Sequence, residues 1–295
     1  MNFFKALFGG KTESPEEKNE QEQRKKFEVL KYDGMKALRM GQNDYAVQCF
    51  THALELSDDL EVHDCLSQAY TRSGNLLAAF DELRMLSDAQ PDNPQIFIRM
   101  ADVSYMLEDY TAMGDACEKA LLIDKDNPVV HLLYARACKG HGDVVNAVAM
   151  LTKAIVLKPG FGDALLMRGQ LLLDMGDVDG AEEDADHLQE LFPEQEDALL
   201  LKARVELKRG RDQAAIGVYD KVIAVNPFCV QAFRERGAVR LKNGDKDGAE
   251  QDMRTVLEID PEQGADINGE YSAEGIEHKV RNTYRALDPL NLFPH

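Results

Sequence analysis

Several features that would mark a membrane-spanning or nucleic-acid-binding protein are missing from this sequence of 295 residues. There is no tryptophan, and the five cysteines form no CxxC pair. Cys49, Cys117, Cys138 and Cys229 lie within apolar helical patterns, so we expect them to be reduced and buried. No apolar run approaches the roughly 18 to 20 residues that cross a bilayer. With 34 Lys and Arg against 53 Asp and Glu, the net charge is −19, which excludes nucleic acid as a partner.

Motifs that carry chemistry are also absent. The seven histidines form no HExxH motif and no zinc-type cluster with cysteine. Gly160-Phe161-Gly162 begins like a dinucleotide loop but lacks the third glycine and the surrounding strand–helix–strand pattern. Acidic residues such as Glu182, Glu183 and Asp184 are expected on a solvent-facing helix, where charge runs are usually hydrated. We therefore predict no enzyme activity, no cofactor and no metal site.

What the chain does contain is a repeat of about 34 residues. A glycine is followed by an alanine five residues later and by a proline twelve residues after that. The glycines are Gly74, Gly142, Gly176, Gly210 and Gly244; the alanines are Ala79, Ala147, Ala181, Ala215 and Ala249; the prolines are Pro91, Pro159, Pro193, Pro227 and Pro261. A fixed period of this length predicts stacked helical hairpins. The seven predicted units are 27–59, 60–93, 94–127, 128–161, 162–195, 196–229 and 230–261.

Each unit has residues suited to a close crossing of two helices. Small residues recur in the predicted first helix, and in every unit except 94–127 an alanine of the second helix follows twelve residues later. The small residues are Gly34, Ser67, Ala101, Ala135, Gly169, Ala203 and Gly237. Facing small residues let two helices cross tightly. Larger apolar residues are expected to fill the seam to the next unit, namely Phe50, Leu83, Leu151, Tyr219 and Met253.

With these positions the chain resembles the tetratricopeptide repeat proteins over residues 27–261. The resemblance implies an all-α fold, a right-handed α-solenoid (superhelix) of about seven helix–turn–helix repeats that binds protein or peptide ligands. Three departures stand out. The family's first aromatic position has no tryptophan, unit 94–127 has Glu108 and Met113 where glycine and alanine are expected, and the first unit ends in Asp58 instead of proline.

The two ends of the chain differ from the repeats. Residues 1–26 are predicted to form a flexible charged segment with a short Phe-rich start, and residues 262–295 a capping helix, over 272–287, and a tail. Phe3, Phe4, Leu7 and Phe8 could form one apolar face that contacts a membrane or a partner. Membrane contact is expected only through residues 1–10. In the absence of a spanning segment, we expect a cytoplasmic location.

The resemblance places the first helix of each unit on the concave side, where a groove is expected. The first helices carry net positive charge and the second helices net negative charge. We predict that the groove is lined by apolar and basic residues, namely Ile98, Leu132, Arg136, Lys139, Leu166, Leu200, Arg204, Lys208, Arg234 and Lys242. Such a lining would bind a peptide with apolar side chains and an acidic group. In the alternative interpretation, the leucines pack between neighbouring first helices and the cations balance local acids.

The carboxylate clamp of some family members, which holds the acidic end of chaperones, is incomplete here. Lys31 stands at its first position, but Met35 and Cys65 replace the two asparagines. The predicted function is therefore a non-catalytic scaffold or adaptor that binds a peptide or partner segment. Two alternatives stay open: a membrane-associated assembly factor anchored by the Phe-rich start, and a regulatory sensor whose tail, Pro289 to Phe293, occupies the groove.

Overall fold

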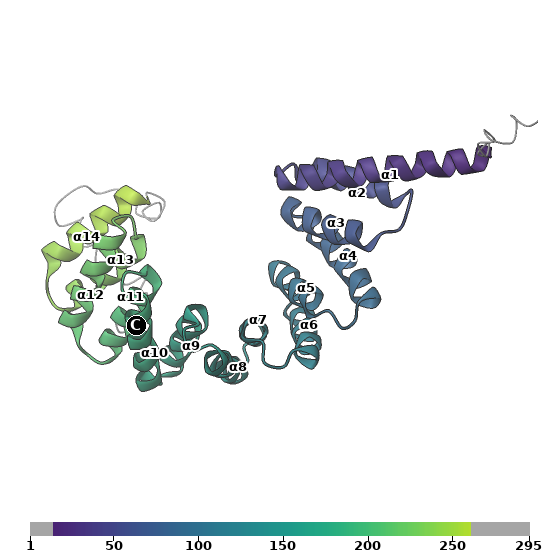
Figure 1. Cartoon of the computed structure of the whole chain (residues 1–295). Coiled ribbons are helices and arrows are strands. Elements are labelled where there is room, and N and C mark those ends of the chain that lie inside the picture. The colour runs from purple at the N-terminus through teal and green to yellow at the C-terminus, as the bar shows by residue number, and fades with distance from the viewer. Residues whose placement is uncertain (1–13, 261–295) are drawn as a thin grey trace, which may run out of the picture. The chain divides into compact units, whose positions relative to one another are not determined.

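The computed structural model describes residues 14–260. In this range the chain forms fourteen α-helices and no strand (Figure 1). The helices are α1 Pro15–Arg39, α2 Asn43–Leu54, α3 Leu60–Ser73, α4 Leu76–Ala89, α5 Pro94–Met106, α6 Tyr110–Ile123, α7 Pro128–Gly140, α8 Val144–Leu157, α9 Gly162–Met175, α10 Val178–Leu191, α11 Glu196–Lys208, α12 Asp212–Val225, α13 Val230–Lys242 and α14 Lys246–Ile259. The prediction of an all-α solenoid is confirmed. The predicted cap over 272–287, the tail and the Phe-rich start lie outside the described residues.

The helices pair as hairpins in the phase that the repeat indicates. From α3 onward, each odd-numbered helix begins at the first residue of a predicted unit: Leu60, Pro94, Pro128, Gly162, Glu196 and Val230. Between the two helices of a hairpin, a glycine takes a left-handed conformation, with φ of +81° at Gly74 and +86° at Gly176. Because residues with a Cβ rarely adopt this conformation, glycine is favoured at this turn.

The seam of each hairpin is closed by the repeated alanine. This residue is fully buried in every hairpin that has it: Ala46, Ala79, Ala147, Ala181, Ala215 and Ala249 are all 0% exposed. At Gly34, an added Cβ would lie 2.6 Å from the Phe50 ring, a separation that atoms do not tolerate. Glycine at that position therefore makes room for the aromatic side chain of the opposite helix.

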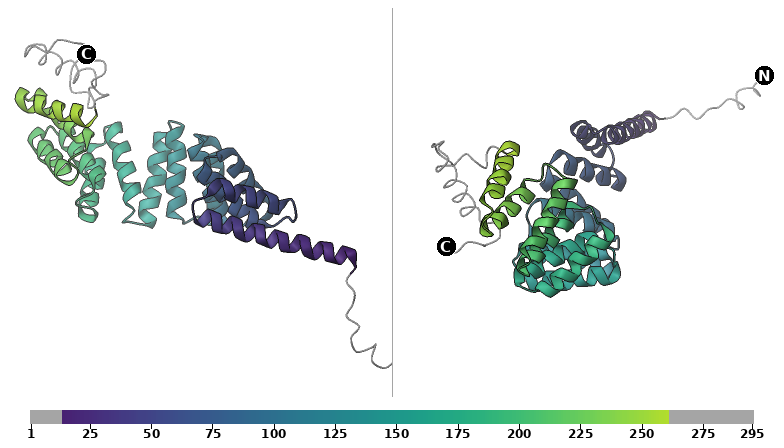
Figure 2. Two further views of the ribbon diagram at one scale, coloured as in Figure 1. Left: turned by 90° about the horizontal axis from the view of Figure 1, so that it is seen from above. Right: turned by 90° about the vertical axis from the view of Figure 1, so that its left-hand side faces the viewer.

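The chain divides into an N-terminal unit up to Ala147 and a C-terminal unit from Val148. Within the N-terminal unit, α1 contacts α3 and α5 contacts α7; within the C-terminal unit, α9 contacts α11. Among the described helices, no two second helices of neighbouring hairpins make comparably extensive contacts. In these three pairs, the first helices therefore lie closer together than the corresponding second helices. Within each unit, consecutive hairpins lie side by side (Figure 2).

The hairpin α5–α6 tolerates the two residues that depart from the repeat. Glu108 takes the conformation that glycine takes elsewhere, with φ of +58°, and Met113 is 0% exposed. A left-handed non-glycine residue costs about 1 kcal/mol or more. The helices nevertheless pack as closely as in the other hairpins, because the flexible methionine fills the seam where alanine is expected.

One carboxylate that the sequence placed in solvent is buried. Asp184 is 1% exposed, and Arg168 binds it through two nitrogens, with Nη2 2.6 Å from Oδ1 and Nε 2.9 Å from Oδ2. The same pairing recurs between Arg236 and the 1% exposed Asp252. In both cases the arginine on the first helix lies 16 residues before the aspartate on the second. The prediction of a hydrated Asp184 is therefore wrong, because an arginine from the paired helix supplies its counter-charge.

The segment expected to be flexible is helical from Pro15 onward. Ser14 accepts a hydrogen bond from the backbone N–H of Glu17, and the Glu17 carboxylate accepts one from the Ser14 backbone. This capping box, with proline at the first helical position, starts a helix even where no side chain is buried. As a result α1 has 25 residues, and its first turns project past the neighbouring helices (Figure 2).

The five cysteines are free thiols. Cys49, Cys117 and Cys229 are buried, as expected, whereas Cys138 is half-buried. Burial raises the pKa of Cys117 to about 12, so this thiol is neutral and weakly nucleophilic at physiological pH.

We expect Glu108→Gly to raise the free energy of unfolding by about 0.5–1 kcal/mol, because glycine removes the left-handed strain. The matched change Gly74→Ala should lower the free energy of unfolding by about 1 kcal/mol. The space around Gly74 is open, so the cost comes only from its positive φ, which residues with a Cβ rarely adopt. Denaturant unfolding followed by circular dichroism measures both. Equal effects of the two changes would contradict this account of the turns.

Candidate functional site

The predicted groove residues of the N-terminal unit lie on α5 and α7. Ile98, Asp102 and Tyr105 are spaced by four and three residues on α5, so they share one side of that helix. Arg136 on α7 holds its guanidinium carbon 5.6 Å from the Tyr105 ring centroid. We call these residues, together with Met106, Val129 and Lys139, the α5–α7 face.

The centre of the α5–α7 face is a cation over an aromatic ring beside an acid. The carboxylate of Asp102 is accessible to solvent, yet burial by surrounding groups raises its pKa, and the charge of Arg136 opposes that shift. Accessibility together with partial desolvation is typical of a concave surface. Arg136 forms no ion pair within residues 14–260, so its charge has only the ring and a more distant carboxylate as neighbours.

The other predicted residues of this unit differ in availability. Lys139 is exposed, and its side chain makes no hydrogen bond or ion pair with the described residues. Ile98 is half-buried against the apolar core. Leu132 is only 4% exposed, so its side chain belongs to the core, as the alternative interpretation of the ladder supposes.

In the C-terminal unit, Arg204 is held by a buried acid. Its Nη2 lies 2.6 Å and its Nε 3.1 Å from the two carboxylate oxygens of Glu235, which is 1% exposed. The Tyr219 hydroxyl donates to the same carboxylate at 2.8 Å, and Gln231 donates at 3.0 Å. Burial, together with the Glu235 charge, raises the pKa of Tyr219. These contacts join α11, α12 and α13, so Arg204 serves the packing of the unit.

The remaining predicted residues of this unit separate into two kinds. Lys242 is exposed and forms a surface ion pair, 3.0 Å from a carboxylate oxygen of Asp212, whereas Leu200 is 4% exposed and part of the core. Leu166 is half-buried against the core. Lys208 is exposed, and the buried Nε of Arg234 has no hydrogen-bond partner in the described part of the chain.

Sequence reasoning missed three apolar residues on the α5–α7 face. Tyr105 is 46% exposed, Met106 47% and Val129 42%. A signal was available, because Tyr105 lies one repeat of 34 residues before Lys139, which the sequence did place in the groove. Only the structure shows that these large side chains stay uncovered.

Lys31, at the first position of the incomplete carboxylate clamp, is already paired with acids of this chain. The Nζ of Lys31 lies 2.6 Å from a carboxylate oxygen of Glu61 and 3.2 Å from one of Asp59. Lys31 is therefore neutralised by the next hairpin. Nearby, Arg24, Phe27 and Leu56 line an open cavity of about 400 Å³.

Residues 14–260 contain no group of three or more His, Cys, Asp or Glu that could hold a metal ion. Over the same residues, none of the helices has the length and apolar character needed to cross a membrane.

We expect Arg204→Ala to lower the free energy of unfolding by about 3–5 kcal/mol, because it leaves the Glu235 carboxylate buried without its counter-charge. Lys242→Ala, which removes a more exposed ion pair, should cost less than about 1 kcal/mol. Chemical denaturation compares the two variants. Similar losses would contradict the structural role of Arg204.

Arg136→Gln should raise the pKa of Asp102 further, because the positive charge that opposes the effect of burial is removed. Carbon-detected NMR titration of the Asp102 carboxyl measures the shift, with Lys139→Gln as the control. An unchanged titration in Arg136→Gln would show that the two groups do not interact.

Comparison with known proteins agrees with the hairpin architecture. The family model described as tetratricopeptide repeat matches residues 166–224 and 213–263. Among curated relatives, the chain is 36% identical over 96 residues, 32% of its length, to the Protein CTR9 homolog of Arabidopsis thaliana. The chain spans 9% of that relative and 36% to 42% of other curated relatives that it matches.

Two solved structures share the fold. A tetratricopeptide repeat protein from Parabacteroides merdae aligns with a TM-score of 0.66 at 15% identity, covering 88% of this chain and 99% of that one. YrrB, a TPR protein with an unusual peptide-binding site, aligns with a TM-score of 0.53 at 15% identity, covering 68% of this chain and 97% of that one. With its glycine turns, buried alanines and paired helices in the same 34-residue phase, the chain has the fold of tetratricopeptide repeat proteins, and residues 166–263 match that family's model.

Proposed function

We propose that this protein is a non-catalytic adaptor whose α5–α7 face binds a segment of a partner protein that carries apolar side chains and a carboxylate. The tetratricopeptide repeat fold implies a protein–protein interaction scaffold, and the proposal adds the place and the chemistry of the ligand. A cytoplasmic location is part of the proposal.

The observation that carries the proposal is the state of Arg136. Its guanidinium stacks over Tyr105 and has no ion-pair partner within residues 14–260. A stacked arginine loses little further freedom when it binds, and its planar fork matches a carboxylate with two parallel hydrogen bonds. A ligand carboxylate at Arg136 would gain this pair without displacing one inside the protein.

The exposed apolar residues supply the rest of the contact. Tyr105, Met106 and Val129 are each about half exposed. Covering them would contribute roughly 2 to 5 kcal/mol before the cost of ordering the ligand. With one carboxylate pair of about 1.5–3 kcal/mol, the gross sum stays at or below the roughly 8 kcal/mol that a Kd of 1 μM requires, so we expect weaker binding through this face alone. Lys139 would add a second, exposed cation.

The C-terminal unit has a smaller set of candidate groups. We assign Arg204 and Leu200 to packing, set Lys242 aside because Asp212 already pairs with it, and retain Lys208 and Arg234 as ligand contacts. The buried Nε of Arg234 lacks an acceptor, which an acidic ligand could provide. The fold shared with YrrB, a protein described as having a peptide-binding site, agrees with a ligand on this kind of scaffold.

The two alternative functions depend on segments outside the described residues. The membrane-associated assembly factor needs residues 1–10, and the autoinhibited sensor needs Pro289 to Phe293. No contact within residues 14–260 favours either of them.

Selection from a random peptide library on the immobilised protein tests the proposal. We expect enriched peptides with Leu, Ile or Phe close to Asp, Glu or a free C-terminal carboxylate. Arg136→Glu should weaken their binding at least tenfold by isothermal titration calorimetry, about 1.4 kcal/mol or more. The control is Lys221→Glu, an exposed residue of α12. Peptides that bind Arg136→Glu as tightly as the unchanged protein would refute the assignment.

A further inference from the structure

The first hairpin exposes a helix face that every later hairpin buries. The third residue of each predicted unit shows this most clearly. From the second unit onward these residues are 0% to 4% exposed, namely Val62, Ile96, Val130, Ala164, Ala198 and Ala232. In the first unit the equivalent residue, Val29, is 59% exposed. The same contrast holds three residues later, where Leu133 is 3% exposed and Tyr32 is 61% exposed.

In the later hairpins, this face is covered by the second helix of the preceding hairpin. α3 packs on α2, α5 on α4 and α7 on α6 in the N-terminal unit, and α11 packs on α10 and α13 on α12 in the C-terminal unit. Beside this face, two later hairpins form a polar pair with an acid of the preceding helix: the Tyr134 hydroxyl donates to Glu118 at 2.6 Å, and Lys202 lies 2.7 Å from Asp186. The equivalent residue of α1 is Asp33, so on α1 the positive charge for an acidic helix comes from the lysines that flank the apolar residues and not from this position.

On α1, the uncovered face continues along the whole helix. Its residues follow one another at spacings of three or four and so form one stripe. They are Lys18, Glu22, Lys25, Val29, Tyr32, Lys36 and Met40, the last being the residue that ends α1, and we call them the outer stripe. All seven are exposed. The stripe is an apolar patch with lysines on both sides.

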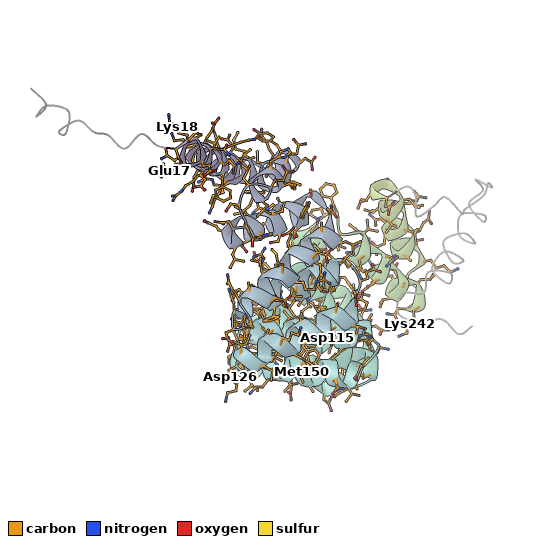
Figure 3. The ribbon with its side chains drawn as sticks, turned by 90° about the vertical axis from the view of Figure 1, so that its right-hand side faces the viewer. Glu17, Lys18, Asp115, Asp126, Met150 and Lys242 are labelled. Carbon is orange, nitrogen blue, oxygen red and sulfur yellow. The ribbon has the colours of Figure 1, made fainter. Side chains whose placement is uncertain are left out.

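The projection of α1 lengthens this surface. Residues 15–26 precede the first buried residue of the helix, Phe27, and add about 18 Å at 1.5 Å per residue. Figure 3 shows Glu17 and Lys18 near the projecting end of α1. A helix with polar residues all round either bridges to another body or is stabilised by side-chain pairs four residues apart, such as Glu20 with Arg24.

We propose that the outer stripe binds an amphipathic helix of a partner protein, in which Asp or Glu flank the apolar side chains. The occupant takes the place that the preceding second helix takes in the later hairpins. Its acids would pair with Lys25 and Lys36, neither of which forms an ion pair or side-chain hydrogen bond with the described residues. This local positive charge lies in a chain with a net charge of −19, so the stripe selects an acidic helix.

A second copy of the chain is the less favourable occupant. Two stripes that met in parallel would bring Lys25 against Lys25 and Lys36 against Lys36. In an antiparallel pair centred between Val29 and Tyr32, Lys25 of one copy would lie opposite Lys36 of the other. Like charges opposite each other destabilise a helix pair, whereas an acidic helix makes attractive contacts at both positions.

Titration of the full chain with two designed helical peptides tests the proposal. Both peptides are about three heptads long with leucine at the a and d positions, flanked by glutamate in one and by lysine in the other. We expect the glutamate peptide to bind at least tenfold more tightly than the lysine peptide. Val29→Asp/Tyr32→Asp and Lys25→Glu/Lys36→Glu should each weaken its binding at least tenfold. Thermal unfolding should be unchanged in both, because all four residues are exposed.

The matched controls are Leu77→Asp on α4, where Leu77 is 71% exposed, and Lys221→Glu on α12. Both should bind the glutamate peptide as the unchanged protein does. Arg136→Glu should also leave this binding intact, which separates the outer stripe from the α5–α7 face.

Three results would overturn the proposal. The first is equal binding of the two peptides, or no effect of the stripe variants. The second is self-association of the unchanged protein in sedimentation velocity that Val29→Asp/Tyr32→Asp abolishes, because the occupant would then be a second copy. The third is a gain of tenfold or more in peptide affinity when residues 1–10 are deleted, because the start of the chain itself would then cover the stripe.

Discussion

The close approach of the two helices in each hairpin is the constraint on which the rest of the structure depends. An alanine that is 0% exposed lies at this crossing in six hairpins, for example Ala79 and Ala215. Adding a larger side chain at one of these alanines would overpack a crossing built around a small residue, at a cost of about 1–3 kcal/mol; in the α5–α6 hairpin the buried Met113 takes this position instead. Because six of the seven described hairpins close in the same way, neighbouring hairpins present matching faces, and first helices within each unit contact one another.

Charge then decides which residues of that surface are free to act. Buried acids hold arginines inside the protein, within one hairpin where Asp184 binds Arg168 and between neighbouring hairpins where Glu235 binds Arg204. A cation bound in this way is part of the core and cannot also bind a ligand without exposing a buried acid. Arg136 lies over the Tyr105 ring and forms no ion pair with a buried acid within residues 14–260. In this acidic protein, Arg136 and Lys139 on the α5–α7 face therefore remain available to bind an acidic ligand.

The repeat predicted the fold closely because its signal is local and occurs many times. Small residues, glycine turns and buried alanines recur in phase, and the predicted unit starts coincide with helix starts such as Leu60 and Val230. The candidate site was less predictable. Whether a lysine or arginine is free depends on partners elsewhere in the chain, 31 residues away for Arg204 and 30 for Lys242. The helical start of α1 depends on one cap at Ser14. The polar composition of residues 11–26 predicted a flexible segment, and this local capping signal was not used.

Hydrogen exchange of Ala79→Leu, resolved by peptide mass spectrometry, tests the closed crossing most directly. Ala79 is fully buried in the core of the N-terminal unit, so the added side chain must separate α3 from α4. We predict that amide protection falls by about tenfold or more in these two helices, with smaller losses in α2 and α5, which pack on them. Unchanged protection in α3 and α4 would contradict the claim that close helix crossing holds this structure together.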